Sequence, residues 1–87
     1  MKIKNGFVVR EIAGECVVVA LGEVSKIFNG IIKLNDTAKI IWNMLSEGSD
    51  RESVIEAIVQ SYEVERETVE RDVDCFIETL KGANILE

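Results

Sequence analysis

The sequence predicts an α+β domain in which three short N-terminal strands precede three helices. Two observations support this. Residues 7–34 contain runs rich in valine and isoleucine, whereas after residue 34 the apolar residues recur at steps of three and four. With 87 residues the chain is long enough for one domain around one hydrophobic core, so we expect residues 1–87 to form a single domain.

The first two strands are expected to form a hairpin. Residues 7–12 and 16–21 are rich in valine and isoleucine, and Ala13-Gly14-Glu15 lies between them as a short turn.

A polar connection over residues 22–26 follows, and Asn29-Gly30 is a turn dipeptide because both residues tolerate positive φ. Residues 31–34 then form a third, short strand. The sequence leaves open whether Ile27 and Phe28 pair with this strand or pack beneath it.

The first helix is expected to begin after Asn35, whose side chain can cap it, and to end near Gly48. Its apolar stripe consists of Ala38, Ile41, Trp42 and Leu45. Trp42 is interpreted as a core anchor because it belongs to this stripe.

Two further helices follow. Ser49 with Glu52 fits a capping box for the second helix, and the third begins near Glu65 or Arg66. The stripes are Val54, Ile55, Ile58, Val59 and Tyr62 in the second helix, and Val69, Val73, Phe76, Ile77 and Leu80 in the third. Gly82 or Asn84 could end the third helix in the left-handed conformation. The second and third helices resemble a helix-turn-helix.

The composition argues against several classes of function. Sixteen acidic and ten basic residues give a net charge of −6, which disfavours a nucleic-acid-binding surface. No apolar run approaches the roughly 20 residues that span a bilayer, and residues 1–6 lack the features of a signal peptide. We therefore expect a soluble cytoplasmic protein with no membrane and no nucleic-acid partner.

The sequence also predicts that the chain is not an enzyme. It has no histidine, the commonest catalytic base and a frequent metal ligand. Cys16 and Cys75 lie far apart within apolar patterns and are expected to be buried packing residues. The carboxylates fall on helix faces that are expected to be exposed, where nothing raises a pKa. We expect no catalytic residue, no metal and no cofactor.

Several motifs occur together in a characteristic order. They are Arg10-Glu11-Ile12-Ala13-Gly14-Glu15 before Val17-Val18-Val19, Leu34-Asn35, Ala38, Ile41-Trp42, Leu45, Tyr62-Glu63-Val64, Asp72-Val73, Phe76-Ile77, Leu80 and Asn84-Ile85-Leu86. Over nearly the whole chain this series resembles the pyrroloquinoline quinone synthesis protein D (PqqD) family. Asn84 stands where glycine is usual, and the segment 22–29 is longer than in the founding members.

The resemblance implies a winged helix-turn-helix-like fold that serves as a recognition element for ribosomally synthesised, post-translationally modified peptides. In such domains the leader of the precursor peptide joins the sheet beside the third strand, in a groove closed by the third helix. The implied role is a non-catalytic chaperone that captures the leader and presents it to a modifying enzyme, such as a radical S-adenosylmethionine enzyme, a cyclase or a leader protease. This mode needs an exposed strand and an amphipathic helix beside it.

The resemblance also supplies, by position, an expected set of peptide-binding residues. They are Ile31, Ile32, Lys33 and Leu34 of the third strand, and Glu70, Val73, Asp74, Ile77 and Lys81 of the third helix. Val73 and Ile77 are placed at the border between core and groove, where plain core packing is an equal interpretation. The acidic members predict a leader that carries some lysine or arginine.

Other interpretations come from different classes. The helix-turn-helix topology permits a winged-helix DNA-binding regulator with the third helix as reader, but the acids of residues 66–74 would then face phosphates. A structural subunit that holds two enzymes together is a third interpretation. An unfilled sheet edge also predicts a homodimer through that edge in the absence of peptide.

Overall fold

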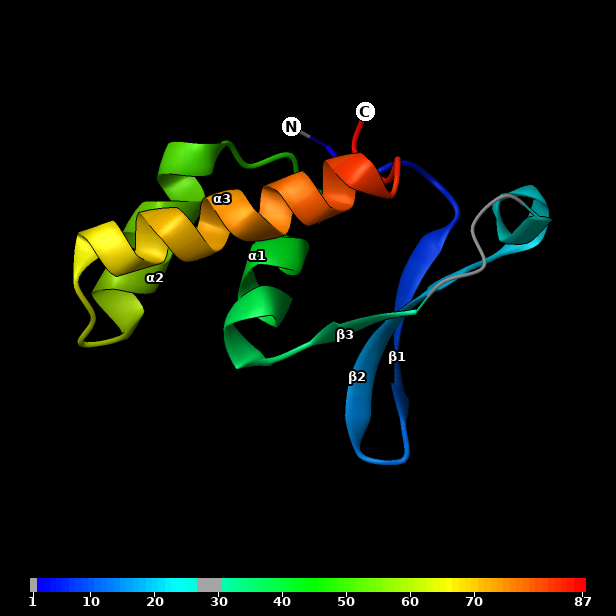
Figure 1. Ribbon diagram of the computed structural model, residues 1–87, viewed down its shortest axis with the longest axis horizontal. Coiled ribbons are helices and arrows are strands. Elements are labelled where there is room, and N and C mark those ends of the chain that lie inside the picture. Colours follow the sequence, from blue (N-terminus) through cyan, green and yellow to red (C-terminus); the bar gives the residue numbers. More distant parts are fainter. Residues whose placement is uncertain (1, 27–30) are drawn as a thin grey trace.

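The computed structural model describes residues 2–26 and 31–87. Three strands form an antiparallel sheet in the order β1-β2-β3, and three α-helices follow it in the chain (Figure 1). The elements are β1 (Phe7–Ile12), β2 (Glu15–Ala20), the 3-10 helix η1 (Gly22–Lys26), β3 (Ile32–Leu34), α1 (Asp36–Ser46), α2 (Arg51–Ser61) and α3 (Arg66–Gly82). The predicted α+β fold of three strands followed by three helices is confirmed. Among the described residues, no helix is long and apolar enough to cross a membrane.

The β1–β2 hairpin closes through a two-residue turn. Ala13 and Gly14 have φ of 52° and 80°, and positive φ at both central positions is what a type I′ turn requires. Glu15, predicted to be part of the turn, instead begins β2 and lies opposite Ile12.

The third strand is one residue shorter than predicted, because Ile31 precedes it. The segment 22–26, predicted as a polar connection, forms η1. The predicted Asn29-Gly30 turn and the position of Ile27-Phe28 lie outside the described residues.

The helix caps were partly predicted. The Asn35 side chain accepts a hydrogen bond from the Ala38 N–H at 2.8 Å, which confirms the cap of α1. At α2 the prediction was wrong, because Asp50 rather than Ser49 is the N-cap and accepts from the Ser53 N–H at 2.8 Å. This hydrogen bond lowers the pKa of Asp50 below its usual value.

The third helix begins and ends close to the predicted positions. Glu65 is its N-cap, Gly82 is its last residue, and Asn84 follows with φ of 60°. Asparagine tolerates this left-handed conformation, so it substitutes for the glycine that is usual at such a position.

The core lies between one face of the sheet and the three helices. Trp42 is 4% exposed within it, which confirms its predicted role as an anchor. The fully buried members are Val18, Ile41, Leu45, Val54, Ile55, Val73, Leu80 and Ile85.

The two ends of the chain close the core beside the end of α3 (Figure 1). Ile3 and Leu86 form an isolated antiparallel bridge, and the Lys4 N–H donates to the Ile85 carbonyl at 2.8 Å. This bridge ties the C-terminal end of α3 to the segment that leads into β1.

Candidate functional site

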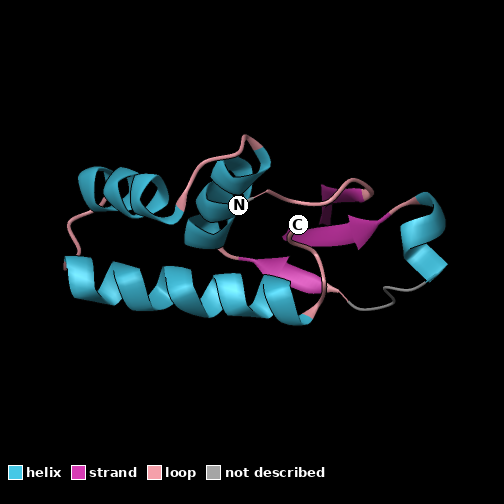
Figure 2. Ribbon diagram, turned by 90° about the horizontal axis from the view of Figure 1, so that it is seen from above, coloured by secondary structure: helices cyan, strands magenta, loops and turns pink. Residues whose placement is uncertain are grey.

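The sheet has an open edge at β3. Its only strand neighbour among residues 2–26 and 31–87 is β2. In two perpendicular views, α3 lies on the side of β3 that faces away from β2 (Figures 1 and 2). The open edge therefore runs alongside α3.

The pairing register shows which backbone groups of β3 lie at that edge. The Leu21 N–H donates to the Gly6 carbonyl at 2.7 Å, just beyond the end of the hairpin ladder. Because hydrogen-bonding direction alternates along an antiparallel strand, Val17 and Val19 also bond toward β1, whereas Cys16 and Val18 bond toward β3.

The same alternation continues into β3. Leu34 and Ile32 lie opposite Cys16 and Val18, so their amides and carbonyls point toward β2. The N–H and C=O of Lys33 point the other way, toward the open edge. Lys33 thus presents one donor and one acceptor to an incoming strand.

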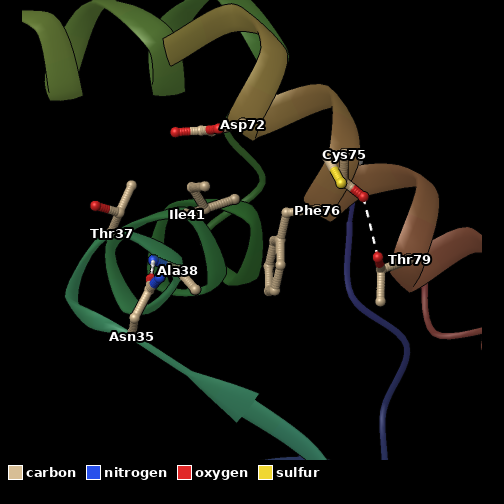
Figure 3. A pocket seen from close by; sticks show the side chains of 8 residues that line it. All are labelled: Asn35, Thr37, Ala38, Ile41, Asp72, Cys75, Phe76 and Thr79. Carbon is tan, nitrogen blue, oxygen red and sulfur yellow. Dashed lines mark hydrogen bonds between the residues drawn. The ribbon is translucent and has the colours of Figure 1, made fainter. Parts of the chain in front are cut away.

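A groove lies between α1 and α3, next to the end of β3. Its volume is about 300 Å³, and Figure 3 shows the side chains that surround it. These residues are Asn35, Thr37, Ala38, Ile41, Asp72, Cys75, Phe76 and Thr79.

The groove combines an apolar floor with polar walls. Ile41 is 2% exposed, and Phe76 projects from α3 into the space between the two helices, half-buried against the core (Figure 3). On the walls the Thr79 hydroxyl donates to the Cys75 carbonyl at 3.0 Å, and Asp72 supplies the carboxylate. Such a surface suits apolar side chains that carry a polar or basic group at their end.

A smaller pocket of about 90 Å³ adjoins the groove. The two share Thr37 and Asp72, and the second lies among the end of α2, the start of α3 and α1. Its other residues are Ile58, Tyr62, Val64, Thr68 and Val69.

Of the four predicted strand residues, Ile32, Lys33 and Leu34 lie in β3 and Ile31 directly precedes it. Ile31 is 69% exposed, and Lys33 is exposed with its ammonium 3.3 Å from a carboxylate oxygen of Glu15. Ile32 is half-buried and Leu34 is 6% exposed, and both pack against the core.

The structure does not bring the five predicted helix residues to the groove. Val73 and Ile77 are 0% and 4% exposed and belong to the core, so the packing interpretation describes them. Lys81 is exposed, 3.8 Å from Glu78.

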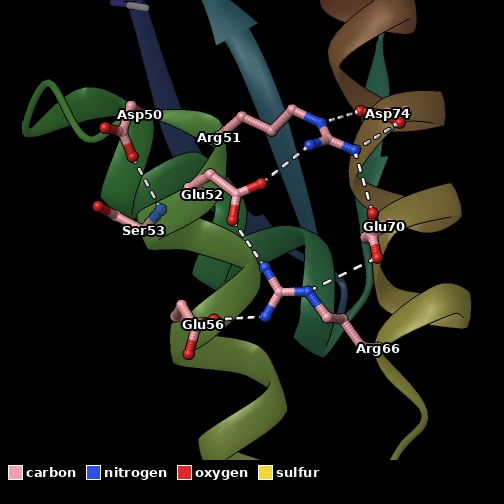
Figure 4. Close-up of polar contacts among 8 residues, drawn as sticks. All are labelled: Asp50, Arg51, Glu52, Ser53, Glu56, Arg66, Glu70 and Asp74. Carbon is pink, nitrogen blue, oxygen red and sulfur yellow. Dashed lines mark hydrogen bonds and ion pairs between the residues drawn. The ribbon is translucent and has the colours of Figure 1, made fainter.

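Glu70 and Asp74 face α2 instead (Figure 4). Asp74 accepts two hydrogen bonds from the Arg51 guanidinium, at 2.6 and 3.0 Å, and Glu70 lies 3.7 Å from the same group. The hydrogen bonds from Arg51 lower the pKa of Asp74 below its usual value.

Arg66 completes this bridge between α2 and α3. Its guanidinium pairs with Glu56, with Glu52 at 2.6 Å and with Glu70 at 3.6 Å (Figure 4). The surface around the start of α3 is therefore occupied by acidic side chains, which disfavours the interpretation of α3 as a DNA-reading helix.

None of the eight residues that line the groove belongs to the predicted peptide-binding set. Cys75 was expected to be buried, which is wrong because it is exposed at the groove. Cys16 is half-buried against the core. The spacing of Asp72, Phe76 and Thr79, at steps of four and three, is the sequence signal for this face.

Comparisons with known proteins bear on this geometry. A family model for coenzyme PQQ synthesis protein D (PqqD) matches residues 15–86. The chain belongs to the PqqD family. The resemblance read from the sequence motifs is thereby confirmed. Among curated proteins, none matches the chain significantly.

Two solved structures share the PqqD-like fold over almost their whole length. One is TbiB1 in complex with the TbiA(beta) leader peptide, with a TM-score of 0.78 and 33% identity over 100% of this chain and 95% of that chain. The other is lasso peptide synthetase B1 complexed with the leader peptide, with a TM-score of 0.77 and 26% identity over 99% of this chain and 95% of that chain.

Proposed function

We propose that this PqqD-family domain binds the leader segment of a ribosomally made precursor peptide by adding it as a fourth strand along β3. The observation that carries the proposal is the open edge of β3 beside the groove between α1 and α3. Both similar solved structures are complexes with leader peptides, which supports the same class of ligand here.

Backbone pairing supplies the sequence-tolerant part of this binding. The N–H and C=O of Lys33 exchange hydrogen bonds with the residue of the added strand that lies opposite, so docking needs no particular side chain. Ile31, Ile32 and Leu34 belong to the same segment, with the backbone groups of Ile32 and Leu34 turned toward β2.

Alternate side chains of the leader supply the selective part. Those on the core side of the added strand enter the groove, where we assign the α3 contacts to Asp72, Cys75, Phe76 and Thr79 in place of the helix residues predicted from the sequence. Asp72 favours a basic group at the groove, although an exposed ion pair contributes only about 0–1 kcal/mol.

The domain acts as a presenting partner and carries out no chemistry itself. The chemistry then belongs to a separate modifying enzyme, such as a radical S-adenosylmethionine enzyme, a cyclase or a leader protease, in the cytoplasm. In the absence of leader the same edge pairs two copies of the chain, and leader competes with that homodimer.

Amide NMR tests the proposal directly. The labelled protein is titrated with synthetic peptides that cover the short reading frames encoded beside its gene, and with scrambled versions of the same composition. We expect saturable shifts at residues 31–34 and at Asp72, Cys75, Phe76 and Thr79 for one native peptide and none for its scrambled form. Shifts confined to residues 66–71, or seen only with duplex DNA, contradict the proposal.

A further inference from the structure

The two faces of β3 differ in chemistry. Ile32 and Leu34 point to the core, so Ile31 and Lys33 lie on the opposite, outer face of the sheet. On that face Lys33 is next to Val17, which is 4% exposed although it lies outside the core cluster. A strand added to β3 extends both faces, so half of its side chains lie on the outer one.

The register fixes which leader residue meets Lys33. The backbone groups of Lys33 are those at the open edge, so in an antiparallel complex Lys33 and the residue opposite form a hydrogen-bonded pair. Side chains of such a pair lie on the same face, with Cβ atoms about 5 Å apart. The partner of Lys33 therefore projects onto the outer face, away from the groove.

The charges around that position are nearly balanced. The Lys33 ammonium pairs with Glu15, the next outer-face residue along β2, and the two side chains are 71% and 58% exposed. Glu15 and Lys33 line a shallow hollow together with Asp36 and Lys39. Within it the Lys39 ammonium lies 3.6 Å from a carboxylate oxygen of Asp36. Because an ammonium has three donors, Lys33 can serve a second carboxylate, whereas a leader lysine there meets an ammonium directly opposite.

We infer that the outer face of β3 is a second selectivity determinant, at which the leader residue opposite Lys33 is acidic. In an antiparallel strand the residue two positions further on lies opposite Ile31, which is 69% exposed, and is apolar. The leader is thus read on both faces: apolar and basic groups in the groove, and an acidic group on the outer face. This inference rests on the proposed leader binding.

A charge scan of the leader tests it. The native peptide that shifts the NMR spectrum is synthesised with glutamate, alanine or lysine at each position in turn, and its affinity is measured for the wild type and for Lys33→Glu. At one position on the outer face we expect glutamate to bind about 1.5- to 5-fold more tightly than alanine, and lysine more weakly than alanine. In Lys33→Glu the order of glutamate and lysine should reverse at that position alone.

A matched control separates this effect from the overall charge. Lys26→Glu makes the same charge change at an exposed residue that also has a carboxylate partner, Glu23 at 3.3 Å, but lies in η1. It should leave the ranking unchanged. If the leader binds and the glutamate-to-lysine ratio is the same in wild type and Lys33→Glu at every position, the inference is overturned while leader binding stands. If no native peptide binds at all, the proposed function and the inference both fall.

Discussion

A proline at Lys33 separates backbone docking from fold stability. The Lys33 N–H points away from β2, so Lys33→Pro removes an edge donor without breaking a hydrogen bond of the β2–β3 ladder. Ile32→Pro is the contrasting variant, because it removes a donor that faces Val18 in β2. Lys33→Ala is the matched control, since it removes the same side chain and keeps the amide.

The expected magnitudes follow from these placements. Lys33 is exposed and its ion pair with Glu15 is solvated, so the side chain contributes about 0–1 kcal/mol to folding. In the complex, a leader carbonyl that faces the proline ring has no donor, and an unsatisfied carbonyl costs about 1–3 kcal/mol. We therefore expect Lys33→Pro to bind about thirtyfold more weakly than Lys33→Ala, which corresponds to about 2 kcal/mol.

Fluorescence anisotropy with a labelled leader measures the affinity, and urea unfolding measures the stability of the same variants. Lys33→Pro should unfold within about 1 kcal/mol of Lys33→Ala, whereas Ile32→Pro should lose more because it leaves a Val18 carbonyl unpaired. A folded Lys33→Pro that binds the leader as well as Lys33→Ala would refute strand addition at this edge. A Lys33→Pro as unstable as Ile32→Pro would refute the hydrogen-bonding register.

Three further predictions concern α3. Phe76→Ala should weaken leader binding by about tenfold. The ring is half-buried in the free protein, and a leader in the groove would cover the other half, which is worth about half of the roughly 3 kcal/mol gained by burying a whole side chain. Equal affinity of the two proteins by calorimetry would contradict leader contact at the groove. Saturating leader should slow maleimide labelling of Cys75 and leave labelling of Cys16 unchanged, as measured by mass spectrometry. Equal protection of both thiols would contradict leader contact at Cys75, because it would indicate that binding stabilises the whole domain. Because Arg51 lowers the pKa of Asp74 from 3.8, their pairing stabilises the fold above that pH and is lost as the pH falls through the lowered value. Asp74→Asn should therefore be less stable than wild type near pH 7 and equally stable in strong acid, and a constant difference across a pH series of unfolding curves would contradict this.

Much of the fold could be predicted because local signals and packing agree. The valine-rich runs and the apolar stripes correspond to β1, β2 and the three helices, and the Asn35 cap marks the start of α1. The errors lie where two local solutions compete. Both Ser49 and Asp50 are good cap residues. The choice between them depends on where the preceding turn ends, and in the structure this turn contains Gly48 with φ of 89°.

The α3 residues that line the groove could not be predicted because periodicity identifies a core stripe and not what flanks it. Val69, Val73 and Leu80 define the stripe. For the residues on its two sides the sequence predicts the same exposure, because both sides are polar. The side with Glu70 and Asp74 turned out to face α2, since Arg51 lies there, and the side with Asp72 and Phe76 faces the groove. Which neighbour lies on which side is a tertiary property.

The three faces of α3 together explain how a groove stays open beside an unfilled strand edge. The core stripe holds the helix against α1 and α2, and the pairs with Arg51 and Arg66 fix its first half. The hydrogen bond between the Lys4 N–H and the Ile85 carbonyl fixes the segment after its end. The groove lies between these anchors, so α3 need not touch the open edge of β3 to keep its place. A site held in this way loses little conformational freedom when a peptide enters it, which lowers one of the entropic costs of binding. In the proposed mode of binding, backbone pairing at Lys33 then supplies affinity for many leaders, and the side chains on the two faces of the added strand decide among them.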